Sequence, residues 1–232
     1  MSISLPVELE AIAEELNYEH GRLIYEGVGG NEVRRSILPG GVRVITEKMP
    51  GTRGVSIGFW VGVGSRDEAP GMLGSTHFLE HLLFKGTRTR TALDIASSFD
   101  AVGGESNALT AKEHTCYYAR VLDDDAPMAV DVITDMVTNA LLDPAHLEQE
   151  RGVILEEIAM DQDDPTDVAF ENFVEQLMGA NPLGRPIGGT PEEIQAVPRD
   201  AVWEHYKRYY TPDRLVISAA GSLEHSTMVR LV

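Results

Sequence analysis

Two histidines and a glutamate fall within five consecutive residues, His77-Phe78-Leu79-Glu80-His81. Residues four apart lie one turn from each other in a helix, so a helix here directs both imidazoles to one face, with Glu80 close to that face. Neutral imidazoles bind zinc, and a carboxylate beside the metal can act as a general base. The pattern also fits an ordinary solvated helix face. A zinc site needs a third protein ligand, which must come from elsewhere in the chain.

A second acidic stretch, residues 147–158, can supply that ligand. Glu150 and Glu157 lie seven apart, which is two helical turns, so they share one face with apolar residues between them. Carboxylates beside an apolar stripe are costly unless they are paired or bound to a metal. Glu148 and Glu156 fall elsewhere around the helix and are expected to be solvated. The alternative is an acidic surface helix without a metal.

Four motifs follow one another along the chain: HFLEH, FKGT, GGESNALT and ERGVILEEI. Together they resemble the inverzincin, or M16-type, zinc metallopeptidases, the group of pitrilysin, insulin-degrading enzyme and mitochondrial processing peptidase. The resemblance runs from about Val33 to Gly221. It implies a zinc-dependent endopeptidase that hydrolyses peptide bonds in extended or unfolded peptides. A non-catalytic structural or peptide-binding subunit of the same family is the alternative.

The resemblance also implies roles for individual residues. One Zn²⁺ per chain is expected, bound by His77, His81 and Glu157. Glu80 is then the base that activates water, and Glu150 supports the site without binding the metal. In the stretch Asn107-Ala108 the resemblance implies pairing with the substrate backbone, because an extended peptide can add to an open strand edge. An ordinary hairpin is the alternative for this stretch.

The hydrophobic periodicities predict an α+β fold, a mainly antiparallel sheet of about six strands with helices packed on it. The expected strands are 33–38, 42–48, 54–64, 105–111, 115–121 and 215–221, and the main expected helices are 73–85, 91–102, 126–141, 144–160, 166–178 and 198–209. We expect residues 31–232 to form one metallopeptidase domain. Residues 1–30 are expected to be an N-terminal appendage, with a helix at 6–17 and a glycine-rich joint at 27–31.

Family members generally have two such halves that face each other across a substrate chamber. The sequence ends at Leu231-Val232, just after the last strand of one half. The resemblance therefore implies that a C-terminal half is missing from this sequence and belongs to a longer protein or to a partner chain. A homodimer is a further alternative. The isolated half is expected to be weakly active or inactive.

The composition of the chain limits the classes of molecule that it is expected to bind. The formal net charge of −18 argues against nucleic acid and favours basic peptides as substrates, although solubility alone also accounts for it. Cys116 is the only cysteine, so a disulfide framework is excluded and we expect a packed thiol. No apolar run approaches the roughly 18 residues that cross a membrane, and the N-terminus lacks signal-peptide features. The cytoplasm is the expected compartment.

Overall fold

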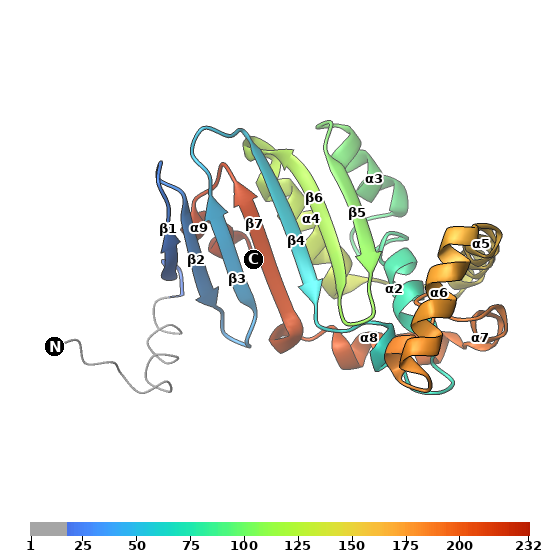
Figure 1. The fold of residues 1–232 in the computed structure, drawn as a ribbon. Coiled ribbons are helices and arrows are strands. Elements are labelled where there is room, and N and C mark those ends of the chain that lie inside the picture. The colour runs from blue at the N-terminus through green and yellow to red at the C-terminus, as the bar shows by residue number, and fades with distance from the viewer. Residues whose placement is uncertain (1–17) are drawn as a thin grey trace.

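The computed structural model describes residues 18–232, in which one twisted sheet carries helices on one face and a helical arm at one end (Figure 1). The strands are β1 (Arg22–Glu26), β2 (Glu32–Ile37), β3 (Arg43–Lys48), β4 (Gly54–Val61), β5 (Glu105–Thr110), β6 (Thr115–Leu122) and β7 (Leu215–Gly221). The helices are α2 (Ser75–Leu83), α3 (Ala92–Asp100), α4 (Ala126–Asn139), α5 (Pro144–Asp163), α6 (Pro165–Met178), α7 (Pro191–Ala196), α8 (Arg199–Tyr209) and α9 (His225–Leu231).

The sheet has seven strands in the order β1-β2-β3-β7-β4-β6-β5. Every neighbouring pair is antiparallel except β3 and β7, which run parallel. The last strand is therefore inserted between β3 and β4, where it joins two antiparallel groups of three strands. β5 lies at one end of the order, and no other strand of the described chain pairs with its outer edge. The predicted α+β class with a mainly antiparallel sheet is confirmed.

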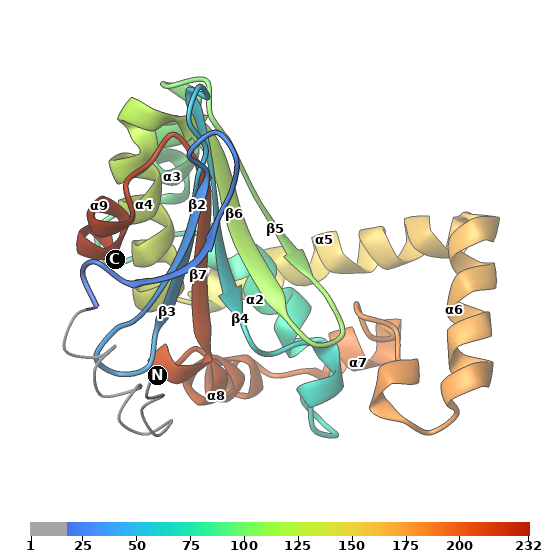
Figure 2. The same cartoon turned by 60° about the vertical axis from the view of Figure 1, so that its left-hand side comes forward.

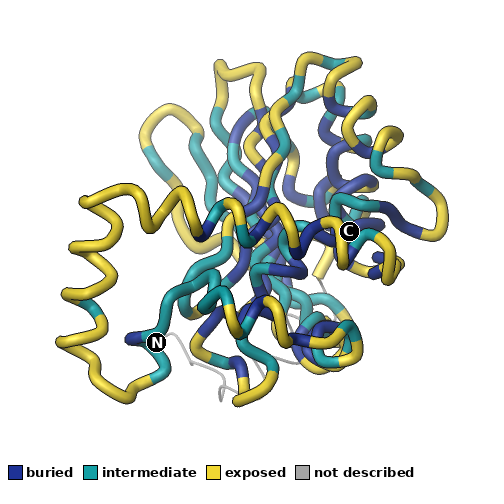
Figure 3. The backbone as a smooth tube through the Cα atoms, turned by 90° about the vertical axis from the view of Figure 1, so that its right-hand side faces the viewer, coloured by how far each residue is buried: buried dark blue, intermediate teal, exposed yellow. Residues whose placement is uncertain are grey.

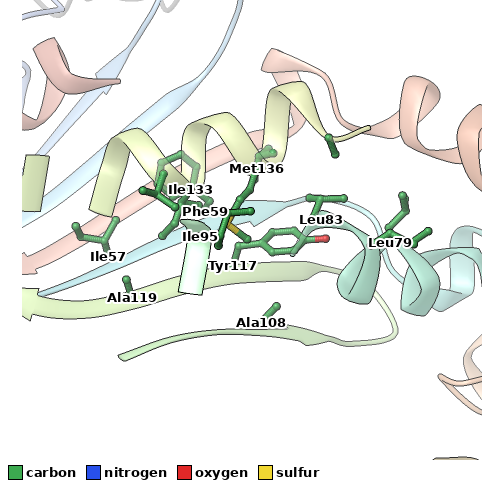
Figure 4. Packing of buried hydrophobic residues seen from close by; sticks show 14 of the residues in the cluster. Ile57, Phe59, Leu79, Leu83, Ile95, Ala108, Tyr117, Ala119, Ile133 and Met136 are labelled. Atoms are coloured by element: carbon green, nitrogen blue, oxygen red, sulfur yellow. The ribbon is translucent and has the colours of Figure 1, made fainter. Parts of the chain in front are cut away.

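Helices α3, α4 and α9 lie on one face of the sheet (Figure 2). Apolar side chains from α2 and α4 meet those of the central strands, as Figure 4 shows for Leu83, Met136 and Phe59. These three side chains are at most 1% exposed. The opposite face of the sheet carries an open hollow of about 550 Å³, bordered in part by Ile45, Trp60 and Tyr118. The core therefore lies between the sheet and one layer of helices.

Helix α5 begins in this core and then leaves it, and α6 follows at its outer end (Figure 2). Leu147, Ile154 and Ile158 of α5 are buried, whereas no residue of α6 is buried. The two helices form an arm that is almost wholly exposed in Figure 3. Asp164 separates them: its side chain accepts a hydrogen bond of 2.7 Å from the Thr166 backbone and so starts α6. The predicted break before Pro165 is confirmed.

Strand β1 lies inside the range 1–30 that the sequence suggested as an appendage. It pairs with β2, and the Gly27 backbone N–H donates to the Asn31 carbonyl across the turn. The predicted domain boundary at residue 30 therefore falls within a β-hairpin. The helix expected at 6–17 lies outside the described residues.

Helix α9 lies beside β3 and was not among the helices expected from the sequence. Cys116 is buried in β6, as expected, and burial raises the pKa of its thiol to about 12. Among residues 18–232, no helix combines the length and apolar character that crossing a membrane requires.

Candidate metal centre and substrate edge

Helix α2 holds the HxxEH motif, and its start is fixed by a carboxylate from the preceding loop. Gly74 occupies the N-cap with φ +86° and has no side chain to cap the helix. Instead, the Glu68 carboxylate accepts hydrogen bonds from the backbone N–H groups of Gly74 (2.8 Å) and Thr76 (2.6 Å). Burial raises the pKa of Glu68, and these hydrogen bonds oppose the rise. Glu68 therefore sets the position of the turn that carries His77.

The apolar side of α2 anchors the helix in the core. Its apolar residues are at most 1% exposed: Phe78, Leu79, Leu82 and Leu83. Burying a side chain of this size contributes about 1.5–3 kcal/mol of stabilisation. His77, Glu80 and His81 consequently lie on the sides of α2 that the core leaves free.

Helix α5 crosses α2 and brings Glu157 to the two histidines. The Nε2 atoms of His77 and His81 are 3.3 Å apart, and Glu157 Oε2 lies 3.5 Å from the first and 3.4 Å from the second. A tetrahedral zinc ion with bonds of about 2.0–2.1 Å places its ligand atoms about 3.3–3.4 Å apart. The three atoms form a triangle of nearly that size, so this donor set fits a zinc ion. Within the described residues, this is the one group of His, Cys, Asp and Glu side chains that converges in this way.

The imidazoles of His77 and His81 have different surroundings. Burial lowers the pKa of His77 and the neighbouring His81 lowers it further, while Glu80 and Glu157 oppose the change. Because zinc binds the neutral ring, a lowered pKa keeps His77 competent to bind metal. The Nδ1 atom of His77 is buried and has no hydrogen-bond partner among the described residues. It faces Gly188, where an added Cβ would lie 3.6 Å from it.

His81 has a hydrogen-bonded partner behind it. Its Nδ1 lies 3.0 Å from Glu150 Oε2, and Lys85 Nζ lies 2.8 Å from Glu150 Oε1. Burial raises the pKa of Glu150, but the hydrogen bonds from Lys85 and His81 outweigh it, so the pKa lies below the ordinary value. A carboxylate that accepts from Nδ1 fixes the tautomer in which Nε2 is free to bind metal. Glu150 thus contacts His81 and lies behind the ligand triangle.

Glu80 is oriented by the edge strand of the sheet. The hydroxyl of Thr110, the last residue of β5, donates a hydrogen bond to Glu80 Oε2. Helix α2 and strand β5 are in contact along this region. The carboxylate that the family resemblance suggests as a base is therefore carried on the helix of the two histidines and hydrogen-bonded to the edge strand.

The outer edge of β5 offers backbone groups at alternate residues. The Ala111 N–H donates to the His114 carbonyl, which lies just before β6. In an antiparallel pair, the backbone groups of every second residue point to the partner strand, so those of Leu109 and Asn107 also point to β6. The backbone of Thr110 and Ala108 then faces outward. In agreement, the Ala108 N–H donates to the Asn107 side-chain oxygen at 2.8 Å. Ala108 therefore presents its main chain to the open edge, whereas Asn107 reaches that edge only with its side chain.

An acidic cavity adjoins the ligand triangle. It measures about 270 Å³ and lies between α6, the loop at 184–188 and the end of the β5–β6 hairpin. Asp161, Asp167 and Glu171 line it together with Lys112 and Gly188, the residue that faces His77. Burial raises the pKa of Glu171, with Asp161 contributing and Lys112 opposing. Three carboxylates against one ammonium leave this cavity with an excess of negative charge.

Comparison with known proteins decides the family. Residues 43–191 match the family model described as "Insulinase (Peptidase family M16)", a span that includes α2, β5 and α5. The chain belongs to the insulinase family of peptidases. The expected relationship is therefore confirmed.

The curated members of the insulinase family that resemble this chain are longer. An uncharacterised zinc protease of Streptomyces coelicolor is 53% identical over 206 residues, which are 89% of this chain and 44% of that protein. A probable mitochondrial-processing peptidase subunit beta of Arabidopsis thaliana is 35% identical over 201 residues, 87% of this chain and 38% of that protein. This chain thus spans less than half the length of either relative.

Solved structures of other proteins share the fold of this chain. A protease from Helicobacter pylori superimposes with a TM-score of 0.83 at 22% identity, covering 87% of this chain and 49% of that one. Pitrilysin gives a TM-score of 0.81 at 23% identity, covering 90% of this chain and 23% of that one. At these identities the likeness establishes the fold, and the match covers less than half of each solved chain.

The structure brings together the residues that the motifs suggested and adds others. His77, Glu80, His81, Glu150 and Glu157 gather at the crossing of α2 and α5, with the edge strand next to them. Glu68, Lys85 and Thr110 were not predicted as site residues from the motifs. For Thr110 a signal existed, because strand alternation places it on the same face as Ala108. The contacts of Glu68 and Lys85 depend on how a loop and a helix end fold back, and no local pattern gives that.

Proposed function

We propose that this chain is the metal-binding half of a zinc-dependent endopeptidase that cleaves extended peptides. The observation that carries the proposal is the triangle of His77, His81 and Glu157 ligand atoms beside Glu80, next to an open strand edge. A non-catalytic subunit would need neither a metal-sized triangle nor a carboxylate beside it. The relatives named as zinc proteases support the same activity.

The chain's own groups divide the work of hydrolysis. The substrate lies along β5, where the outward carbonyl group of Ala108 accepts a hydrogen bond from its backbone and Asn107, whose side chain holds the Ala108 N–H, lies beside it. Zinc, when bound, supplies a Lewis acid that polarises the scissile carbonyl and lowers the pKa of water. Glu80 accepts the proton of the attacking water and delivers it to the leaving amine. Glu150 keeps His81 in its metal-binding tautomer.

The acidic cavity supports a preference for a basic side chain in the substrate. Asp167 and Glu171 are on α6 and Asp161 is at the end of α5, so all three stand on the arm opposite the edge strand. A peptide bound along β5 can therefore extend an arginine or lysine side chain into this cavity. The overall charge of −18 further favours encounter with cationic peptides.

The proposed enzyme also needs a second half. This chain spans 44% of the Streptomyces relative and 49% of the Helicobacter structure, and the remainder of those proteins is about as long again. We expect that half to close over the edge strand, either as a continuation of the chain or as a separate subunit.

Two experiments test the function. Glu80→Gln in the two-half protein should lower turnover by at least about 100-fold, the range that a general base supplies, while zinc stays bound. Full turnover in that variant refutes the assignment of the base.

For the cavity, peptide pairs that differ only by arginine or its neutral analogue citrulline report the effect of charge. The arginine peptide should have a kcat/KM about 10-fold higher, a ratio that Glu171→Gln reduces. Equal rates for the two peptides at every position tested would exclude a basic preference and leave the peptidase assignment intact.

A further inference from the structure

Thr110 combines two features that the proposed hydrolysis does not yet use: a side-chain contact with Glu80 and a backbone that faces the substrate edge. Its hydroxyl donates to Glu80 Oε2, and its backbone belongs to the outward-facing set of β5. Glu80 Oε1 has no hydrogen-bond partner among the described residues. One carboxylate oxygen is therefore held by the edge strand, and the other remains available for a proton.

The position of Thr110 is itself fixed by the residues that follow it. The Ala111 carbonyl accepts a hydrogen bond from the Ser65 N–H (3.2 Å), and the Lys112 carbonyl accepts one from the Arg66 N–H (3.0 Å). Gly64 allows this close approach, because a Cβ there would lie 2.3 Å from the Lys112 carbonyl carbon. The end of β5 is thus clamped to the loop that precedes α2.

This arrangement links the substrate edge to the base. A peptide added to β5 hydrogen-bonds with the same strand whose last side chain orients Glu80. The general base is most effective when it lies within hydrogen-bond reach of the water it deprotonates, and a displacement of about 1 Å can cost on the order of 100-fold in rate. A rotating, unsupported carboxylate would spend much of its time away from that position.

We propose that Thr110 is a positioning residue that aligns Glu80 with the substrate bound along β5. The proposal rests on the proposed peptidase function. Thr110 keeps its own proton throughout: it donates to Oε2, while Oε1 takes the proton from water and passes it to the leaving amine. The peptide-binding groups of Thr110 belong to its backbone, so removing the hydroxyl should change the chemical step and spare substrate binding.

The test compares Thr110→Val, which keeps the shape and removes the hydroxyl, with Thr110→Ser, which keeps the hydroxyl. Both are made in the two-half protein, next to Glu80→Gln. We expect Thr110→Val to lower kcat by about 10- to 100-fold with KM and zinc affinity each unchanged within about 3-fold. Thr110→Ser should retain kcat within about 5-fold, because the donor is still present.

The outcomes separate this inference from the function beneath it. If Glu80→Gln is inactive and Thr110→Val is as active as the unsubstituted protein, the positioning role is refuted and the peptidase assignment stands. A loss of zinc affinity in Thr110→Val also refutes it, because the residue would then support the fold of the site. If Glu80→Gln keeps full turnover, the assignment of Glu80 as the base in the proposed function fails, and the role of Thr110 fails with it.

Discussion

The proposed third metal ligand is the point at which the site can be tested most directly, because two adjacent glutamates offer a matched comparison. Glu157 Oε2 lies 3.4–3.5 Å from both histidine Nε2 atoms, whereas Glu156 is exposed and has no contact with them. Glu157→Gln and Glu156→Gln each remove one negative charge from the same turn of α5. Only the first alters the ligand triangle, so a general effect of charge cancels in the comparison.

The size of the expected effect follows from the number of ligands. A complete four-ligand zinc site in a protein is worth about 10–16 kcal/mol, so each ligand accounts for about 2.5–4 kcal/mol. An amide oxygen remains a weak donor and recovers part of this loss. With about 1.4 kcal/mol per factor of ten, Glu157→Gln should raise the dissociation constant for zinc by about 100-fold or more, and Glu156→Gln by less than about 3-fold.

The measurement is competition for zinc with a chromophoric chelator at pH 7.5, on this chain and on both variants, with the metal content of the purified proteins as a second readout. The ligand assignment is wrong if Glu157→Gln binds zinc as the unsubstituted chain does. It is also wrong if the two variants lose affinity equally, because the effect would then come from charge alone.

Three further predictions follow. Glu150→Gln should weaken zinc binding about 10- to 100-fold by releasing His81, whereas Glu148→Gln on the same helix should not, and chelator competition compares them. His205 is neutral and 1% exposed, with its pKa lowered by burial to about 4. Its stabilising contribution is complete above pH 6.5 and falls as the pH drops toward 4, so urea unfolding should show about 2 kcal/mol less stability from this residue at pH 5 than at pH 7. His205→Gln should reduce the total loss by that amount, while His225, whose pKa burial also lowers to about 4, keeps its own share. Phe78→Ala should lower the free energy of unfolding by about 3–5 kcal/mol, whereas Phe173→Ala on the exposed arm should change it by less than about 0.5 kcal/mol; equal effects would contradict the described burial.

Local patterns in the sequence predicted much of the fold. The expected helix at 73–85 forms as α2 at 75–83, and the expected strand at 215–221 forms with those bounds as β7. These elements have complete apolar periodicities and clear ends, which local interactions determine. The HxxEH spacing predicted the ligand face of α2 for the same reason, since residues four apart share a helix face.

The arrangement of those elements could not be read from the same patterns. No local signal shows that β7 pairs in parallel with β3, because strand order depends on contacts between distant residues. Helix α6 is misleading in a different way: its Phe170, Phe173 and Leu177 have the spacing of a buried face, yet each is more than 60% exposed. The spacing shows which residues of α6 share a face, and it does not show whether anything covers that face.

The insertion of β7 between β3 and β4 has a consequence for synthesis of the chain. A ribosome releases β1 to β3 and β4 to β6 long before it releases β7, so the nascent protein first holds two separate three-stranded ribbons. All three proposed zinc ligands emerge before β7 does, on helices whose supporting sheet is still incomplete. Because contacts between distant segments form slowly, we expect the pairing of β7 with β3 and β4 to limit the folding rate of the whole domain. A chain interrupted before Leu215 would carry every proposed metal-binding side chain and lack the strand that joins the two ribbons into one sheet.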